Sequence, residues 1–194
     1  PLQVGELTLG IGDEVGERVQ RGQMIAAPAG FVSVALHAPV TGTVTEIDLR
    51  LHPNGKMMPA IVIATDPLDS QRVPETHPVD PASLTPKEMV ALVQNGGLVG
   101  LGGAAFPSHV KFQVPEGKQM QAAVINGCEC EPYLTCDHRL MVERPEVVMR
   151  GAEIIRIQIG AERGYIGVEA NKLDAVAALE AVAKPTVEVV SLKV

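Results

Sequence analysis

The spacing of apolar residues changes about one third of the way along the chain. Up to residue 66 they occur in short runs separated by glycine, proline and Asn-Gly pairs, a pattern typical of strands joined by tight turns. The runs are MIAAP, VSVALHAP, TGTVTEIDL and AIVIAT. Amphipathic periodicity does not extend beyond two helical turns here, so we expect residues 1–66 to form a β-rich module.

Residues 67–84 separate this module from the first predicted helix. Five prolines fall within residues 67–86, which predicts a linker or an extended strap. A helix start follows, with Ser83 or Thr85 as N-cap and Pro86 at the first helical position. We expect the buried stripe of this helix to consist of Met89, Val90, Leu92 and Val93.

From about residue 121, strands and helices alternate. The sequence predicts strands at 121–129, 163–170 and 186–194, and helices at 144–161 and 171–183. Such alternation implies right-handed crossovers and a parallel sheet. We therefore predict an α/β fold, α+β overall, in which a Rossmann-like domain occupies residues 85–194. Ligands gather at the carboxyl ends of such strands, which here carry NGCECEPY and VEANK.

The composition is that of an ordinary globular protein and excludes some functions. Of 194 residues, 46% are hydrophobic and 20% are charged. A formal net charge of −7 and only five aromatic residues argue against a nucleic-acid surface, which needs a basic face and stacking platforms. The apolar runs are shorter than the roughly 20 residues that a membrane-spanning helix needs, so we expect no direct span.

The three cysteines lie close together, at Cys128, Cys130 and Cys136. So few favour a reducing compartment over a disulfide framework. Their spacing does not match the CxxC pattern of zinc or iron–sulfur sites, so we predict packing thiols and assign no metal ligand. Because the chain starts at Pro1 and stops in a strand-like run, we interpret it as a piece of a longer protein, truncated at its C-terminus.

Two phrases of the N-terminal module resemble the biotinyl- and lipoyl-type barrel-sandwich hybrid fold. GERVQRGQ matches a GxxVxxGQ hairpin, and APVTGTV matches APxxGxV. Carriers of this fold modify a lysine between methionines, and the comparable stretch here is NGKMMP, with Lys56. Lys56 follows the APVTG turn, whereas a carrier lysine precedes it. We therefore predict a structural module with Lys56 in a solvent loop.

Residues 95–112, NGGLVGLGGAAFPSHVKF, hold five glycines in their first nine positions. Asn95-Gly96-Gly97 predicts a helix C-cap. The rest lacks the Lys-Ser/Thr of a P-loop and does not follow a strand, so neither nucleotide fingerprint fits. It is either a plain turn or a loop whose backbone N–H groups approach a phosphate or flat ring, with Lys111 as counter-charge. His109 is expected at the surface of this loop.

A second loop, INGCECEPYLTCDHR, leaves the first strand of the predicted sheet. It carries Asn126, Glu129, Glu131 and Asp137. One interpretation is an exposed acidic turn. The other is a set of hydrogen-bonding groups for a polar heterocycle and ribose hydroxyls, because an amide both donates and accepts while carboxylates accept.

The two loops together resemble a known family. GLGGAAFPSHVKF followed by INGCECEPYLTCDHRLM resembles the C subunit of the Rnf electron-transport complex and, more distantly, the NADH-oxidising flavoprotein subunit of respiratory complex I. In the latter, GRGGAGFPTGxKW and NxDExEPG hold FMN with NADH stacked above it. RGYIGVEANKLDAV resembles the Rnf stretch IGIExNKPxA, and the likeness covers essentially all of the chain.

The resemblance implies roles for nine residues. The FMN-binding bend would be shaped by Gly100, Gly102, Gly103 and Ala104. Phe106 would lie against the flavin and nicotinamide, and Lys111 would meet the FMN phosphate or the NADH. Asn126 and Glu129 would bond to the isoalloxazine or ribityl edge, and Glu131 would contact the nicotinamide nucleotide. Two positions depart from the complex I pattern: Leu101 replaces an arginine and Cys128 an aspartate, which removes one cation from the phosphate side.

The function that the resemblance implies is an electron-input subunit. It would pass electrons between NADH, FMN and two [4Fe–4S] clusters held beyond Val194, on the cytoplasmic face of the bacterial inner membrane. Its partners would be the other subunits of the complex, with ferredoxin as a further candidate. We assign no catalytic acid or base, because the cofactor carries the chemistry. The alternatives are a scaffold that docks partner subunits and a small phosphate- or cobalamin-related binding module.

Overall fold

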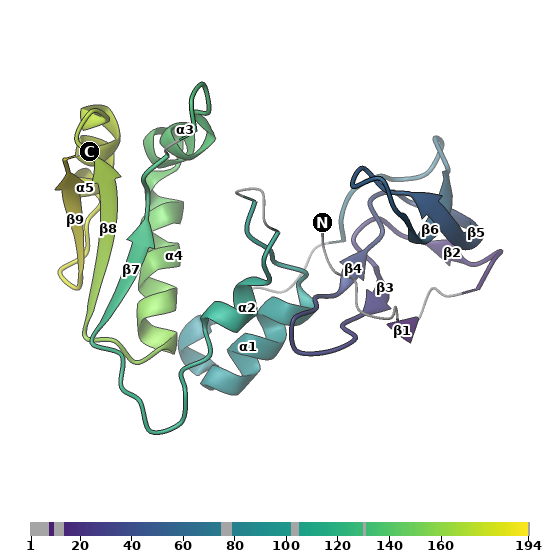
Figure 1. The fold of residues 1–194 in the computed structure, drawn as a ribbon, viewed down its shortest axis with the longest axis horizontal. Helices are drawn as coiled ribbons and strands as arrows, with labels where there is room; N and C mark the ends of the chain where they lie inside the picture. Colours follow the sequence, from purple (N-terminus) through teal and green to yellow (C-terminus); the bar gives the residue numbers. More distant parts are fainter. Residues whose placement is uncertain (1–7, 10–13, 75–78, 102–104, 130, 194) are drawn as a thin grey trace. The chain divides into compact units, whose positions relative to one another are not determined.

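The computed structural model describes residues 8–9, 14–74, 79–101, 105–129 and 131–193 (Figure 1). Internal contacts divide the chain into two units. Unit 1 consists of Pro1–Val79 and Lys87–Lys111, and unit 2 of Asp80–Pro86 and Phe112–Val194. The first predicted helix and the glycine loop therefore pack within unit 1, whereas the sequence grouped them with the parallel sheet.

The described residues of unit 1 form two small antiparallel sheets. One is formed by β1 (Thr8–Leu9), β3 (Met24–Ala27) and β4 (Leu36–His37), and the other by β2 (Arg18–Val19), β5 (Gly42–Leu51) and β6 (Met57–Thr65). Val19 and Val44 of the second sheet share a buried core with Ile25 of the first. The prediction of a β-rich module is confirmed, and we call β1–β6 the β module.

Tight turns give the β module its predicted motifs. Gly42 ends the APVTG phrase, and any Cβ there would collide with the carbonyl oxygen of Ala64 on the neighbouring strand. Only glycine permits this close approach of two backbones. Lys56 lies exposed in the turn between β5 and β6, as predicted.

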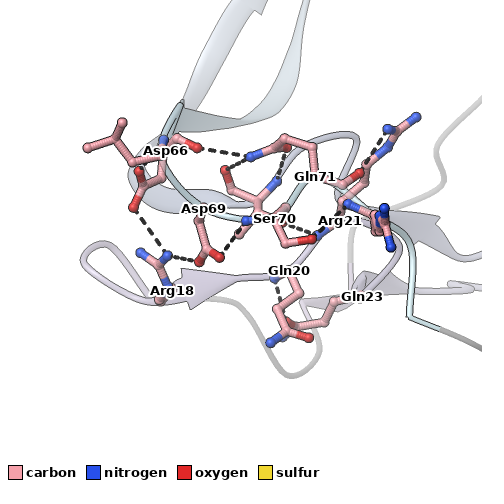
Figure 2. Close-up of polar contacts among 11 residues, drawn as sticks. Arg18, Gln20, Arg21, Gln23, Asp66, Asp69, Ser70 and Gln71 are labelled. Carbon is pink, nitrogen blue, oxygen red and sulfur yellow. Dashed lines mark hydrogen bonds and ion pairs between the residues drawn. The ribbon is translucent and has the colours of Figure 1, made fainter.

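The segment 66–74 is a strap that lies on the β module (Figure 2). The Arg18 guanidinium pairs with the carboxylates of Asp66, at 3.2 Å, and Asp69. The Gln71 side chain brackets Thr41: its Oε1 accepts from the Thr41 N–H at 2.9 Å, and its Nε2 donates to the Thr41 carbonyl at 3.2 Å. Of the two interpretations of this proline-rich segment, the strap is the one that these described residues form.

Helix α1 (Pro86–Asn95) begins at the predicted proline and buries Met89 and Val93. The prediction for Leu92 was wrong, because this side chain is 47% exposed. The helix is rotated so that Gln94, on the other side of Val93, faces the β module and donates from its amide to the Ser33 carbonyl oxygen at 2.9 Å. A one-turn helix, α2 (Ser108–Lys111), closes the unit and was not predicted.

Unit 2 has a three-stranded parallel sheet in the order β7 (Ala122–Asn126), β8 (Arg163–Glu169), β9 (Val187–Leu192). Its helices are α3 (Cys136–Glu143), α4 (Pro145–Gln158) and α5 (Leu173–Ala181), and α4 and α5 lie behind the sheet in Figure 1. Met149 of α4 and Leu179 of α5 pack with Ile166 of β8 in one buried core. The predicted parallel α/β fold is confirmed.

Two elements of unit 2 were not predicted. Helix α3 begins within the acidic loop, whose last four residues, 136–139, form its first turn. The short 3₁₀ helix η1 (Pro81–Ser83) is capped by the Asp80 carboxylate, and the Gln158 amide donates to the Pro81 carbonyl at 2.6 Å. None of the helices in the described ranges is long and apolar enough to cross a membrane.

Candidate functional site

The glycine loop begins with a complete helix cap. The Gly97 N–H donates to the Gln94 carbonyl at 3.1 Å, and the Leu98 N–H donates to the Val93 carbonyl at 3.3 Å. Gly97 has φ +70°, which is the left-handed conformation that this cap requires. A Cβ on Gly97 would lie 2.8 Å from the Ala35 carbonyl oxygen, so the residue also allows the loop to contact the β module. The predicted C-cap at residues 95–97 is confirmed.

Backbone hydrogen bonds then close the loop at its base. The Ser108 N–H donates to the Leu98 carbonyl at 3.0 Å, and the Gly100 N–H donates to the Phe106 carbonyl at 2.9 Å. Gly100 thus belongs to the base of the loop rather than its tip. The predicted residues Gly102, Gly103 and Ala104 lie outside the described residues. Leu101, on the tip side of Gly100, is almost fully exposed.

The residues that follow the loop anchor it. His109 is buried, so the prediction of a surface group was wrong. Its Nε2 lies 2.8 Å from the Phe31 carbonyl oxygen, which makes Nε2 the donor, and its ring meets the Phe31 ring edge-on. Lys111 is exposed at the end of α2 and Phe106 is partly exposed. The glycine loop is therefore anchored by buried His109, while the Lys111 ammonium and the Phe106 ring stay accessible to solvent.

The acidic loop extends the carboxyl end of β7. The Gly127 N–H donates to the Gly167 carbonyl of β8 at 2.8 Å, so sheet-like pairing continues one residue past the strand. Asn126 is exposed, and its Oδ1 accepts from the Cys128 N–H at 3.0 Å. Glu131 lies in the exposed turn that follows. Asn126 and Glu131 are therefore placed at the strand edge where ligands of parallel sheets bind.

Glu129 is the interior member of this loop, with a side chain only 2% exposed. Its Oε1 accepts from the Asp137 N–H at 2.9 Å and from the Cys136 thiol at 3.2 Å, and its Oε2 accepts from the His138 N–H at 3.4 Å. The carboxylate thus caps the first turn of α3. The Asp137 N–H, with the thiol, the His138 N–H and Lys172, lowers the pKa of Glu129 to about 2, although burial opposes this shift.

Two charged residues of the VEANK stretch complete the cluster around Glu129. The Lys172 Nζ lies 2.7 Å from Glu169 Oε2 and 3.4 Å from Glu129 Oε2. The ammonium of Lys172 lowers the pKa of Glu169. Burial alone would lower the pKa of Lys172, but the hydrogen bond and charge of Glu169 outweigh it and raise this pKa. Sequence reasoning pointed to this strand end but selected neither Glu169 nor Lys172.

The cysteines do not favour a metal centre in this loop. Ligand atoms of Glu129, Cys136 and Asp137 lie within 4.8 Å of one another. Glu129, however, already accepts backbone N–H groups, and its hydrogen bond raises the pKa of Cys136, which favours the thiol over the metal-binding thiolate. The Cys128 sulfur lies 3.8 Å from the Gly167 carbonyl oxygen, and Cys130 lies outside the described residues.

Backbone strain marks both loops. Among the described residues, the non-glycine residues with positive φ are Ala105, at +48°, and Tyr133, at +66°. Ala105 lies in the glycine loop, and Tyr133 lies, fully exposed, in the acidic loop. A left-handed conformation is uncommon for a residue other than glycine, and such residues cluster at ligand-binding sites. The glycine loop lies in unit 1 and the acidic loop in unit 2. That both loops bind one FMN therefore stays a prediction.

Comparison with known families also divides the sequence into two parts, but the C-terminal match begins at residue 93, within α1, and so includes the glycine loop that packs in unit 1. Residues 93–194 match the family described as the Nuo51 FMN-binding domain, which is more than half of the chain. Residues 12–68 match the RnfC barrel sandwich hybrid domain. The β module therefore has the barrel-sandwich character that its two phrases predicted.

Curated proteins show the same relationship. The chain is 43% identical over 173 residues to the C subunit of the Na(+)-translocating ferredoxin:NAD(+) oxidoreductase complex of Acetobacterium woodii, covering 84% of this chain and 37% of that protein. It is 38% identical over 180 residues to the proton-translocating counterpart of Clostridium ljungdahlii, covering 91% and 39%. For the C subunit of the ion-translocating oxidoreductase complex of Pseudomonas aeruginosa, the identity is 42% over 171 residues, covering 87% and 22%. The chain thus spans less than half the length of these relatives.

Proposed function

Since the chain belongs to the Nuo51 FMN-binding domain family, we propose that it is the FMN-binding part of an Rnf-type C subunit and passes electrons between NADH and FMN. The family match over residues 93–194 is the observation that carries this proposal. The strained residues Ala105 and Tyr133 support it, because they fall in the two loops to which the sequence resemblance assigns the cofactor.

The chemistry of the exposed groups fits FMN. Lys111 offers an exposed cation to a phosphate, and Asn126 offers an exposed amide to the polar edge of a flavin. Phe106 and Leu101 expose apolar surface that a flat ring can cover. Glu131 is assigned to the nicotinamide nucleotide. Glu129 is turned toward α3, so we assign it to shaping the acidic loop as well as to the ribityl edge.

The protein's own part is to bind and orient. Bound FMN would supply the exchange between hydride transfer and single-electron transfer. The loop base at Leu98 and Ser108 would hold the glycine loop in one conformation, and the anchored His109 would keep α2, and with it Lys111, in place. For the whole protein we propose two [4Fe–4S] clusters as the next acceptors, other subunits and ferredoxin as partners, and a position on the cytoplasmic face of the membrane.

The decisive experiment uses the full-length protein reconstituted with FMN. We expect stoichiometric flavin that NADH reduces under anaerobic conditions. Lys111→Glu should weaken FMN binding about tenfold or more, because a charge-assisted contact becomes a repulsion. Lys118→Glu, at another exposed lysine, is the matched control. Full-length protein that binds neither FMN nor NADH would overturn the proposal.

Two further variants test individual roles. Gly103→Val should prevent flavin binding if the loop approaches the ring, since a side chain would occupy that space. Glu131→Gln should slow NADH oxidation more than it reduces FMN retention. Equal loss of both would remove Glu131 from the nicotinamide side.

Docking of partner subunits is a second candidate function, favoured by the ribbon of β5 and β6. Ile47 pairs with Ile61 over the β module's core. Farther along the same face, Leu49 pairs with Pro59, and Leu51 pairs with Met57. Leu51 and Met57 are 73% and 57% exposed. This apolar face continues beyond the core that it covers, as expected of a contact surface.

The docking function predicts that Leu51→Ser with Met57→Ser releases the full-length protein from its complex. Val15→Ser, at another exposed apolar position of unit 1, should not. Retention of the double variant in the purified complex would contradict the docking function and would leave the flavin proposal unaffected.

A further inference from the structure

Three charged side chains, those of Glu129, Glu169 and Lys172, form a cluster that is almost fully buried. With two carboxylates and one ammonium, the cluster has a net charge of −1. Their side chains are 2%, 7% and 14% exposed. Isolated charges are costly at such depth unless hydrogen bonds and opposite charges compensate them. The way in which each carboxylate is compensated therefore determines what the lysine does.

The two carboxylates are compensated differently. Glu129 accepts two backbone N–H groups and one thiol from the first turn of α3, besides the ammonium of Lys172. Glu169 accepts from the ammonium at 2.7 Å and from the Glu129 N–H at 3.4 Å. Among these contacts, Lys172 thus provides the only opposite charge to Glu169. Glu129, in contrast, also accepts hydrogen bonds from the first turn of α3.

Lys172 also contacts the backbone of the acidic loop. Its Nζ lies 3.4 Å from the Glu129 carbonyl oxygen, and the Glu129 N–H faces the Glu169 carboxylate. Both polar backbone groups of Glu129 therefore meet the Glu169–Lys172 pair. This pair belongs to the end of β8 and the turn after it, while Glu129 follows β7, so the contacts join the ends of two adjacent parallel strands.

We propose that Lys172 is a positioning residue of the cofactor site: by neutralising Glu169 beside Glu129 it holds the acidic loop in the course that presents Asn126 and Glu131 to the ligand. This inference rests on the proposed FMN function for its ligand and on the cluster for its mechanism. Without the ammonium, two carboxylates would face each other in a poorly solvated site, and the loop would open to hydrate them.

The experiment compares Lys172→Met, Lys172→Arg and the double variant Lys172→Met/Glu169→Gln in the full-length protein. FMN affinity and hydrogen exchange of residues 127–138 are measured for each. We expect Lys172→Met to weaken FMN binding at least about tenfold and to accelerate exchange in this segment. Lys172→Arg, which keeps the charge, should retain most of the affinity.

The double variant separates charge from packing. Removing the Glu169 charge should restore FMN affinity to within about threefold of wild type, because Glu129 keeps its helix donors. A role limited to packing of the lysine stem would not be rescued by a change at Glu169. Lys118→Met, at an exposed lysine, is the control for general charge effects.

The outcomes distinguish this inference from the function on which it rests. Wild-type protein without FMN would overturn the proposed function, and hydrogen exchange would still report on Lys172. If wild type binds FMN but Lys172→Met changes neither affinity nor exchange, Lys172 does not position the loop. If Lys172→Met is lost to misfolding, equal loss in the double variant would refute the charge account, and recovery would support it.

Discussion

Gln94 and Ser33 are 61 residues apart in the sequence, yet the Gln94 side-chain amide donates a 2.9 Å hydrogen bond to the Ser33 carbonyl oxygen. The same amide nitrogen donates to the Gly30 carbonyl at 3.0 Å, and the Ala35 N–H donates to the backbone carbonyl of Gln94. This one residue therefore fastens α1, from which the glycine loop emerges, to the β module.

We predict that Gln94→Ala destabilises unit 1 by about 1–3 kcal/mol, because the carbonyl of buried Ser33 loses its donor. Denaturant unfolding measures the loss. Gln20→Ala, at an exposed glutamine of unit 1, is the control. Faster hydrogen exchange in residues 96–101 should accompany the loss, and unchanged stability and exchange in Gln94→Ala would show that the glycine loop is anchored by other contacts.

The strap is held by two kinds of contact that can be compared: the Gln71 hydrogen bonds to the Thr41 backbone and the exposed ion pairs of Arg18. Gln71→Ala removes both hydrogen bonds to the backbone of buried Thr41 and should cost about 1–3 kcal/mol. Arg18→Ala breaks pairs with Asp66 and Asp69 that are half exposed to solvent, where ion pairs contribute little. Limited proteolysis within residues 66–74 should therefore accelerate more in Gln71→Ala. The reverse order would mean that the charges hold the strap.

Elements set by local signals could be predicted from the sequence. Pro86 and the Asn95-Gly96-Gly97 cap delimit α1 without help from the rest of the fold, and the apolar strands of unit 2 lie within a few residues of their predicted bounds. Helix α3 could not be predicted in this way. Its N-cap, Thr135, makes no side-chain hydrogen bond, and its cap comes from Glu129, whose position depends on the folded loop.

The candidate site shows the same division. The sequence motifs located both loops, since clusters of glycines and of acidic residues can be recognised directly in the sequence. The partners of Glu129 were not visible, because the contact with Lys172 joins residues 43 positions apart and needs the register of β7 on β8. Burial of His109 was likewise unpredictable, since it depends on one carbonyl and one ring at Phe31, in the β module.

Gly97 provides a test of close backbone packing. Gly97→Ala must accept both a left-handed φ and a Cβ 2.8 Å from the Ala35 carbonyl oxygen. Gly55→Ala has a similar φ, +81°, but its Cβ would meet nothing within 4 Å. Strain alone costs about 1–2 kcal/mol, so Gly55→Ala should lose that much and Gly97→Ala clearly more. Equal loss in denaturant unfolding would show that the loop moves away from the β module at no cost.

The last prediction concerns pH and Glu129. The backbone N–H of Asp137, together with the other donors, lowers the pKa of Glu129 from its usual 4.5 to about 2. A carboxyl group whose pKa is lower in the folded state stabilises the fold above its unfolded pKa. That stability is lost as the pH falls through the folded pKa. Glu129 should therefore contribute fully above about pH 5, and its contribution should decline between about pH 4.5 and pH 2.

Thermal unfolding of unit 2 between about pH 6 and pH 2.5 measures this decline. Glu129→Gln should be less stable than wild type at neutral pH, because an amide nitrogen replaces one acceptor facing the N-terminus of α3. The difference should shrink as the pH falls, since protonation removes the same charge from the wild-type protein. Glu116→Gln, at an exposed position, should run parallel to wild type. Parallel curves for Glu129→Gln and wild type would mean that the capping carboxylate does not titrate with folding.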